Sequence, residues 1–204
     1  RGSDHPVAMD QTDFAAASVE PLVGREREWQ RLMEPCRRLA QGHGGLLCLS
    51  GEAGIGKTAL LERLDSCVAA RGWRPLWGRH FDQPLAPPLD GLRQALGRLL
   101  RLELRLEEEP LAAHLRAGLA TRWPELLVHS RDLAEWLSPD GHPEYSLAAG
   151  ASGARARGRL YHQLHSLLRV AAREQALVLL VDNLQWADGL TLEALAHLVP
   201  LLGA

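Results

Sequence analysis

The sequence predicts an α/β fold in which a parallel sheet is covered by helices on both faces. Short apolar runs alternate along the chain with segments of helical periodicity, which is typical of such folds. The clearest runs, residues 46–50 (LLCLS) and 177–182 (LVLLVD), are continuously apolar rather than alternating. A strand that is buried on both faces of a sheet requires this pattern.

The composition of the 204 residues is that of a globular protein, with 46% hydrophobic and 24% charged residues. The formal net charge of −2 argues against a nucleic-acid groove as the main surface. No apolar run approaches the roughly 20 residues that a membrane span needs. Cys36, Cys48 and Cys67 follow no metal-ligand spacing, and we interpret them as buried or free thiols in a reducing compartment, the cytoplasm.

The N-terminal half is expected to hold two helices and two strands. The helix at 25–40 contains Pro35, which should kink or split it. A buried strand at 46–50 leads into a glycine-rich turn and then a helix at 57–71, which Gly72 ends. A short strand follows at 74–78. We expect residues 1–18 to be a leader that is disordered or was added for expression.

The remainder is expected to be mainly helical around one strand. Residues 81–153 are predicted to form a helical and loop insertion within a domain that spans 19–204. Asp188 or Thr191 can cap the last helix. In order, we expect helices at 89–105, 111–120 and 124–137, a loop at 138–152, a helix at 154–174, a strand at 177–182 and a helix at 190–202.

One motif in the chain carries recognisable chemistry. Residues 51–58 read GEAGIGKT, which fits the phosphate-binding loop pattern G-x-x-x-x-G-K-[ST]. Its glycines let backbone N–H groups face inward, and the helix that begins near Lys57 adds the positive end of its dipole. Lys57 is predicted to contact the β and γ phosphates of a nucleotide, and the Thr58 hydroxyl is predicted to bind Mg²⁺.

The identity of the basic residue in this motif supports the assignment. Of 23 basic residues in the chain, 22 are Arg, and Lys57 is the only Lys. A guanidinium group is larger than an ammonium group and would not fit a backbone cradle in the same way. Downstream, the apolar run at 177–182 ends in Asp182, whose carboxylate is predicted to hold Mg²⁺ from the end of a strand.

With these elements placed, the chain resembles the signal-transduction ATPases with numerous domains, in particular the ATPase region of large LuxR-type, MalT-like transcription regulators. The resemblance rests on residues 22–26 (LVGRE), 47–61 (LCLSGEAGIGKTALL) and 177–188 (LVLLVDNLQWAD). It implies a P-loop NTPase three-layer sandwich, a cytoplasmic protein, and ATP or ADP with Mg²⁺ as ligands. It also implies a nucleotide site made of Val23, Gly24, Arg25, Gly51, Glu52, Ala53, Gly54, Ile55, Gly56, Lys57, Thr58 and Ala59.

The role of the 23–25 segment stays open. The resemblance places it near the adenine, with Val23 as an apolar contact. The same residues are equally compatible with a cap for the first helix.

Two departures from the family pattern affect the expected activity. The predicted catalytic residues are Lys57, Asp182 and Asn183, but Asn183 stands where many relatives have a second acid. Asn can orient water but cannot take its proton, so hydrolysis should be slow unless Glu52 or Asp188 substitutes. The chain also stops at Ala204, before the strand that relatives insert between the P-loop strand and the Asp strand. We therefore expect the N-terminal part of an ATPase domain.

Other clusters do not predict sites. His162 and His165 are spaced i, i+3 but lack a further metal ligand. Arg101, Arg105 and Arg116 are interleaved with acids, as on a solvated face. Trp186 is predicted to pack, with a role in shaping the site as the alternative.

Two functions follow from these observations. The first is an ATP-binding, slowly hydrolysing regulatory switch in a larger transcription regulator. The alternative is an interaction fragment that self-associates through an exposed sheet edge and keeps only a vestigial nucleotide site. Neither function involves direct nucleic-acid contact by this segment or a membrane.

Overall fold

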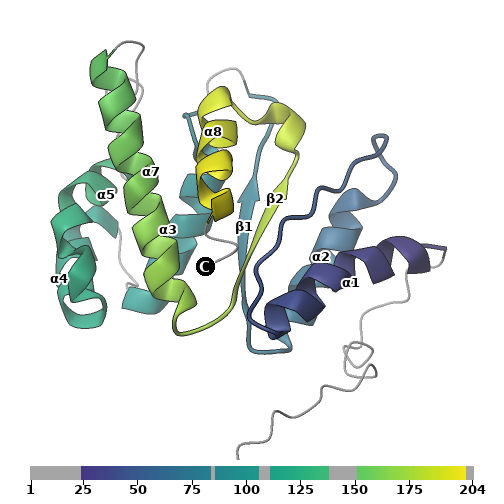
Figure 1. Ribbon diagram of the computed structural model, residues 1–204. Helices are drawn as coiled ribbons and strands as arrows, with labels where there is room; N and C mark the ends of the chain where they lie inside the picture. Colours follow the sequence, from purple (N-terminus) through teal and green to yellow (C-terminus); the bar gives the residue numbers. More distant parts are fainter. Residues whose placement is uncertain (1–23, 84–85, 106–110, 138–150, 201–204) are drawn as a thin grey trace, which may run out of the picture.

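A computed structural model describes residues 24–83, 86–105, 111–137 and 151–200, and Figure 1 shows their arrangement. Helices predominate, and the described strands form one small parallel sheet. The elements are α1 (Glu26–Ala40), α2 (Lys57–Ala69), β1 (Arg74–Arg79), α3 (Asp90–Leu104), α4 (Leu111–Arg122), η2 (Pro124–His129), α5 (Ser130–Leu137), α7 (Ala151–Ala172), β2 (Leu177–Asp182), η3 (Leu184–Trp186) and α8 (Gly189–Leu198).

The two strands pair in parallel from one end to the other. Arg74 is in register with Leu177, and Arg79 with Asp182. Pro75 lacks an N–H donor and is tolerated because β1 is an edge strand of this sheet. The register places the carboxyl ends of both strands at one edge, where Asp182 lies.

Alternate side chains of β2 enter two separate cores. Leu177 and Leu179 pack against the larger core, whereas Val178 and Leu180 belong to the smaller one. In Figure 1, α1 and α2 lie on one side of the strands and α3, α7 and α8 on the other. This division explains why the sequence of β2 is apolar at every position before Asp182.

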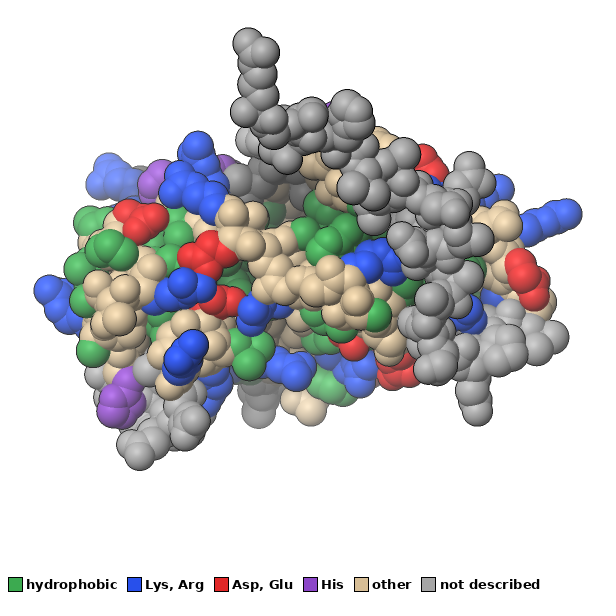
Figure 2. Space-filling view, turned by 90° about the horizontal axis from the view of Figure 1, so that it is seen from below, with side chains coloured by type: hydrophobic (Ala, Val, Ile, Leu, Met, Phe, Trp, Pro, Cys, Tyr) green, Lys and Arg blue, Asp and Glu red, His purple; other side chains and the backbone are tan. Residues whose placement is uncertain are grey.

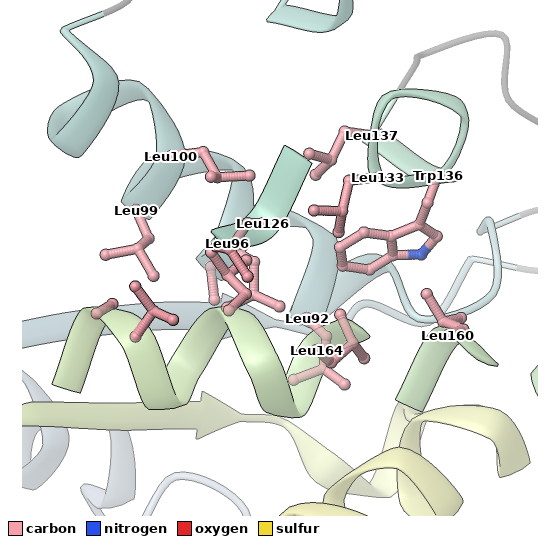
Figure 3. Close-up of a cluster of buried hydrophobic side chains, with 14 of the residues drawn as sticks. Leu92, Leu96, Leu99, Leu100, Leu126, Leu133, Trp136, Leu137, Leu160 and Leu164 are labelled. Atoms are coloured by element: carbon pink, nitrogen blue, oxygen red, sulfur yellow. The ribbon is translucent and has the colours of Figure 1, made fainter. Parts of the chain in front are cut away.

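The larger core is built from leucines of α3, α4, α5 and α7. Figure 3 shows α3 presenting one face to α5 and α7, with the Trp136 ring beside the leucines. Leu96, Leu99 and Leu164 are fully buried. Burying each such side chain contributes about 1.5–3 kcal/mol, so this cluster is a main source of stability.

The smaller core joins α1 and α2 to the other side of β2. Leu32, Met33 and Cys36 of α1 face Leu60 and Leu64 of α2. All three cysteines of the chain are free, as predicted. Burial, reinforced by the neighbouring Cys67, raises the pKa of the Cys36 thiol to about 11, so this thiol stays protonated at neutral pH.

Two glycines allow α3 to lie directly on β1. A Cβ atom on Gly78 would lie 2.4 Å from the carbonyl oxygen of Gly91. A Cβ on Gly91 would lie 2.5 Å from Nε2 of the His80 ring. His80 is buried, and that burial lowers its pKa against the opposing effect of Asp188 and Asp90. These contacts hold the N-terminus of α3 at the carboxyl end of the sheet.

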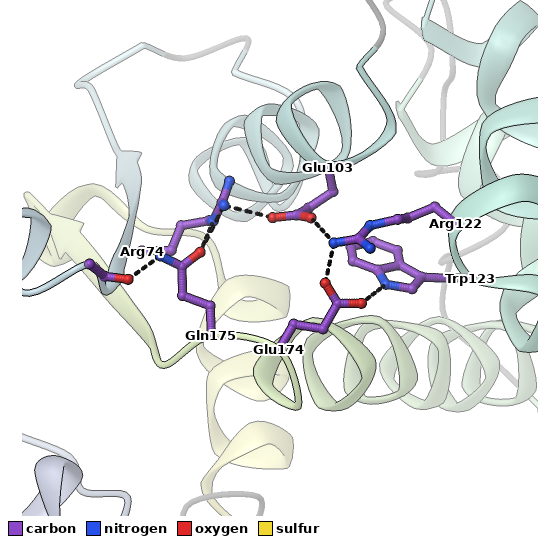
Figure 4. A network of polar contacts seen from close by, with 7 residues as sticks. Arg74, Glu103, Arg122, Trp123, Glu174 and Gln175 are labelled. Atoms are coloured by element: carbon purple, nitrogen blue, oxygen red, sulfur yellow. Dashed lines mark hydrogen bonds and ion pairs between the residues drawn. The ribbon is translucent and has the colours of Figure 1, made fainter.

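A polar network ties the far end of β1 to the helices (Figure 4). Glu103 of α3 is 11% exposed and forms ion pairs with Arg74 at 2.8 Å and with Arg122 at 3.1 Å. Arg122 also pairs with Glu174, which accepts a hydrogen bond from Nε1 of Trp123 at 3.0 Å. Glu103 therefore joins β1, α3 and α4 through one carboxylate.

Most predicted elements form. The strand at 177–182 is confirmed at both ends, and the helices predicted at 57–71 and 89–105 appear as α2 and α3 with slightly shifted ends. The predicted helix at 124–137 is divided into η2 and α5. Asp188 caps α8, because its side chain accepts a hydrogen bond from the backbone N–H of Thr191.

Pro35 does not split the first helix. Helix α1 continues from Glu26 to Ala40 with Pro35 inside it. An internal proline costs about 3 kcal/mol or more. Leu32, Met33 and Cys36 flank Pro35 and are all buried against the same core, and their combined burial exceeds that cost.

The strand predicted at 46–50 is wrong. These residues do not form a strand, and Leu46 is 73% exposed. Among the described residues β2 pairs only with β1, so the backbone of 46–50 has no strand partner. In Figure 1 the segment runs as an extended trace between β2 and α2, and Leu49 packs against the smaller core.

The helices of the predicted insertion share a core with the rest of the chain. Helices α3, α4 and α5 contribute to the same cluster as α7 and α8. The leader at 1–18, Val23 and residues 138–150 of the predicted loop lie outside the described residues. No helix in the described part of the chain is long and apolar enough to cross a membrane.

Candidate functional site

The glycine-rich loop connects the 46–50 segment to α2. Gly54 and Gly56 have φ values of +76° and +93°, a left-handed conformation that favours glycine. Gly56 is also the N-cap of α2, so the turn brings the loop backbone to the positive end of this helix. The sequence predicted this loop, and the structure gives its glycines the backbone conformation for which only glycine is well suited.

Lys57 turns back over the loop. Its Nζ atom donates to the carbonyl oxygens of Gly51 at 2.9 Å and of Glu52 at 2.8 Å. These two hydrogen bonds hold the ammonium group against the backbone of the loop. The side chain of Glu52 is exposed, and only its backbone carbonyl oxygen accepts the hydrogen bond from Lys57.

One hydrogen bond joins the two halves of the predicted site. The Thr58 hydroxyl donates to Oδ2 of Asp182 at 3.0 Å, although 124 residues separate the two positions. Asp182 is 5% exposed and lies at the end of β2. A hydroxyl and a carboxylate oxygen at this separation are the ligand types that Mg²⁺ takes in proteins, usually together with phosphate oxygens and water.

Arg79 is a member of the site that the sequence did not single out. Its Nε lies 3.4 Å from Oδ2 of Asp182, because β1 and β2 place these two residues in register. The Arg79 guanidinium also approaches Glu62 at 3.9 Å and lies over the Trp77 ring at 5.5 Å. The only signal in the sequence was its position directly after the strand predicted at 74–78.

Asn183 anchors the carboxyl end of the sheet. Its backbone N–H donates to Oδ1 of Asp182 at 2.8 Å, and its side-chain amide donates to the carbonyl oxygen of His80 at 3.2 Å. Asn183 has a φ of +58°, which Asn tolerates better than most residues. The residue fixes the orientation of Asp182 and links β2 to β1.

The N-terminal part of the predicted nucleotide site reaches the loop through Arg25. Its guanidinium donates to the carbonyl oxygen of Ile55 at 2.5 Å and pairs with Glu28 at 3.6 Å. The backbone N–H of Gly24 donates to Glu26. Arg25 thus contacts the loop, and it is the N-cap residue of α1 without a side-chain capping hydrogen bond.

Asp188 is held in a structural role. It accepts hydrogen bonds from the backbone N–H groups of Leu89 and Thr191, both at 3.0 Å, and from the Thr191 hydroxyl at 2.6 Å. Burial by itself would raise the pKa of Asp188, but the hydrogen bonds outweigh it and hold the pKa below its ordinary value. A carboxylate with a lowered pKa is a poor proton acceptor, so Asp188 is a weak substitute for the missing second acid.

No cluster of metal-binding side chains is found in the part of the chain that the structure describes. Among the described residues, no group of three or more His, Cys, Asp and Glu side chains could hold a metal ion, which includes His162 and His165. The side chain of Trp186 is 49% exposed on η3, directly after Asn183.

These features define a P-loop nucleotide-binding protein: a glycine loop at a helix N-terminus, a lysine on that loop, and a threonine that contacts an acid at the end of a parallel strand. The family model described as an AAA ATPase domain matches residues 21–204, and the chain belongs to this family. Comparisons with curated proteins and with solved structures gave no match.

Proposed function

We propose that this domain is an ATP-binding regulatory switch within a larger signal-responsive transcription regulator of the MalT-like group. The observation that carries the nucleotide part is the hydrogen bond from Thr58 to Asp182, which brings the loop and the strand end together. The regulatory part rests on the resemblance of residues 22–26, 47–61 and 177–188 to the signal-transduction ATPases with numerous domains.

Each residue of the site has a role in this proposal. Backbone N–H groups of Gly51, Glu52, Ala53, Gly54, Ile55 and Gly56 bind the phosphates together with Lys57, Thr58 and Ala59. Thr58 and Asp182 hold Mg²⁺, which neutralises charge on the phosphates when it is bound. Val23, Gly24 and Arg25 form the adenine side, and the contact of Arg25 with Ile55 supports their closeness to the loop.

Turnover in this proposal is slow, so that the bound nucleotide acts as a signal. Asn183 cannot accept a proton from the attacking water, and its amide is engaged by the His80 carbonyl. Asp188 is engaged by Leu89 and Thr191. The site then lacks a general base. Its predicted catalytic residues stabilise the charge of the phosphates and orient the nucleotide and the attacking water; they are Lys57, Asp182 and Asn183.

The proposal extends to the architecture. We infer the three-layer sandwich of P-loop NTPases, with an ATPase domain over 19–204 and a helical and loop insertion at 81–153. The helices on both sides of the small sheet support it (Figure 1). The protein would act in the cytoplasm, and its nucleic-acid contacts would lie outside this segment. Acidic and basic side chains are interspersed on the face in Figure 2, as on a solvated surface.

A second function is favoured by one observation. Leu46 and Leu47 are exposed on a segment that pairs with no strand in the described part of the chain. Exposed apolar residues beside an open sheet edge favour self-association. In this alternative the domain is an interaction fragment and its nucleotide site is vestigial.

Binding of a fluorescent ATP analogue tests the proposal. We expect Lys57→Ala to weaken binding by about 10- to 100-fold, the loss of one charge-assisted hydrogen bond. Lys57→Arg should also bind weakly, because the guanidinium does not fit the loop. Arg38→Ala, at an exposed position on α1, is the matched control.

Equal affinity of the Lys57→Ala variant and the parent would contradict the site assignment. Size-exclusion chromatography and thermal melting separate the two functions. A monomer whose Tm rises with ATP and Mg²⁺ supports the switch, and a concentration-dependent oligomer that ignores nucleotide supports the alternative.

A further inference from the structure

The carboxylate of Asp182 already has a cation beside it in this structure. Nε of Arg79 lies 3.4 Å from Oδ2 of Asp182, and Oδ2 is the same oxygen that accepts the hydrogen bond from Thr58. The other oxygen, Oδ1, accepts a hydrogen bond from the backbone N–H of Asn183 at 2.8 Å. Both oxygens of this buried carboxylate are therefore engaged, and the one beside Thr58 is shared with Arg79.

The contact between Arg79 and Asp182 is a loose one. Its length of 3.4 Å exceeds the length of about 2.7–2.9 Å that is typical of a charge-assisted hydrogen bond. The Arg79 side chain is 38% exposed, so water reaches it. The strands hold the two residues in register, so their backbones stay together whether or not the side chains touch. The guanidinium can therefore move away from Asp182 without any change in the pairing of the strands.

A second place for the Arg79 guanidinium lies on α2. Oε1 of Glu62 is 3.9 Å from Nη2 of Arg79, and Glu62 follows Thr58 by four residues, so that both lie on one face of the helix. The Trp77 ring lies beside the guanidinium, with its centroid 5.5 Å from the central carbon. This ring is held in place because its Nε1 donates to Asp65 at 2.6 Å. The guanidinium thus has a buried carboxylate on one side and an exposed one on the other.

We propose that Arg79 is a positioning residue that acts through Asp182 and sets how much Mg²⁺ the site needs for ATP binding. Without Mg²⁺, Arg79 neutralises the Asp182 carboxylate, so that this carboxylate does not repel the phosphates. When Asp182 binds Mg²⁺, Arg79 leaves Oδ2 and pairs with Glu62 beside the Trp77 ring. This role rests on the proposed function, because it takes Thr58 and Asp182 as the metal side of an ATP site.

The charges around Arg79 fix the direction of each effect. Two cations compete for one oxygen of Asp182, and solvent screens this buried carboxylate only weakly. Removing the charge of Arg79 therefore makes Asp182 a stronger ligand for Mg²⁺. Removing the charge of Glu62 leaves Asp182 as the one carboxylate that Arg79 approaches in the described part of the chain, so Mg²⁺ should bind less readily. Loss of packing alone would not give two effects of opposite sign.

The Mg²⁺ dependence of ATP binding tests this role. The affinity for a fluorescent ATP analogue is measured as Mg²⁺ is added, and the readout is the Mg²⁺ concentration at half-maximal effect. We expect Arg79→Gln to lower this concentration by about 3- to 10-fold and Glu62→Gln to raise it by about 1.5- to 5-fold. Arg79→Lys keeps the charge and should need as much Mg²⁺ as the parent. So should the control Arg98→Gln, at an exposed position on α3.

Two double variants separate this role from other roles of Arg79. Glu62→Gln should have no effect in the Arg79→Gln background, since Glu62 acts only through Arg79. In a chelator, Arg79→Gln should bind the analogue about threefold or more weakly than the parent, because the charge of Asp182 is no longer neutralised. In the Asp182→Asn background, the same substitution should change nothing. A guanidinium that contacted the phosphates directly would instead be missed in both backgrounds.

Several results would overturn this role while the parent still binds ATP. They are an unchanged or a higher Mg²⁺ requirement in Arg79→Gln, and an equal loss of affinity in the parent and Asp182→Asn backgrounds. If Arg79→Gln does not fold, Glu62→Gln at its 62% exposed position provides the test, and an unchanged Mg²⁺ requirement there would overturn the role as well. A parent that does not bind the analogue at all would instead overturn the proposed function, and the role of Arg79 with it.

Discussion

Gly78 of β1 packs against α3 and Gly97 lies within α3, and alanine at these two positions should change stability in opposite directions. A Cβ at Gly78 would lie 2.4 Å from the Gly91 carbonyl oxygen, and 3.4 Å is about the closest ordinary contact. Helix α3 and β1 must therefore separate by about 1 Å, against the packing of the larger core. Overpacking of this kind costs about 1–3 kcal/mol.

Gly97→Ala meets no such contact. Its Cβ would lie 3.8 Å from Leu137, and alanine gains about 0.5–1 kcal/mol over glycine within a helix. For a domain of this size each kcal/mol changes the Tm by about 2–4 °C. Gly78→Ala should melt below the parent and Gly97→Ala slightly above it, in thermal unfolding followed by circular dichroism. A Gly78→Ala variant as stable as the parent would refute the close packing of α3 on β1.

Two further predictions concern polar contacts that hold the fold together. Glu103→Gln removes both ion pairs of a nearly buried carboxylate and should lower the free energy of unfolding, measured in urea, by about 1–3 kcal/mol. The control Glu135→Gln, at an exposed position, should change this free energy by less than about 0.5 kcal/mol. Equal effects of the two variants would contradict the network in Figure 4. Asp188→Asn should cost about 1 kcal/mol at pH 7 through the weakened cap of α8. Because the pKa of Asp188 is lowered on folding, its contribution is present above the ordinary Asp value of about 3.9 and is lost as pH falls through the folded-state pKa. Urea unfolding at several pH values measures this contribution. Below about pH 4 the free energy of unfolding of the parent should fall more steeply than that of Asp188→Asn. Parallel pH profiles of the two proteins would argue against the capping role of the Asp188 carboxylate.

Local patterns in the sequence predicted the elements whose type follows from the spacing of their apolar residues. The apolar run at 177–182 and the leucine spacing of α2 and α3 are sufficient for a strand and two helices, since burial of these side chains follows from their spacing. The P-loop motif and the acid at the end of the apolar run were enough to predict that Thr58 and Asp182 lie together, although the strand expected before the loop does not form.

The failures have a common physical cause, which is that they depend on contacts distant in the sequence. The run at 46–50 has the composition of a strand, but a strand also needs a paired neighbour, and β2 pairs with β1 alone in the described residues. Arg79 could not be assigned to the site because its contact with Asp182 depends on the register of β1 and β2. The destabilising effect of Pro35 on its helix was outweighed by the burial of its neighbours in the smaller core.

The central claim is that the loop and the strand end form one site for ATP and Mg²⁺, and a double-mutant cycle on Thr58 and Asp182 tests it most directly. The measurement is the affinity for a fluorescent ATP analogue, with Mg²⁺ and with a chelator, in the parent, Thr58→Ala, Asp182→Asn and the double variant. If both residues hold one metal, each single variant weakens binding with Mg²⁺, and the double variant is little worse than the weaker single variant. With the chelator, the affinities of all four proteins should be similar. Additive losses with Mg²⁺, or equal losses in the chelator, would contradict a shared metal site.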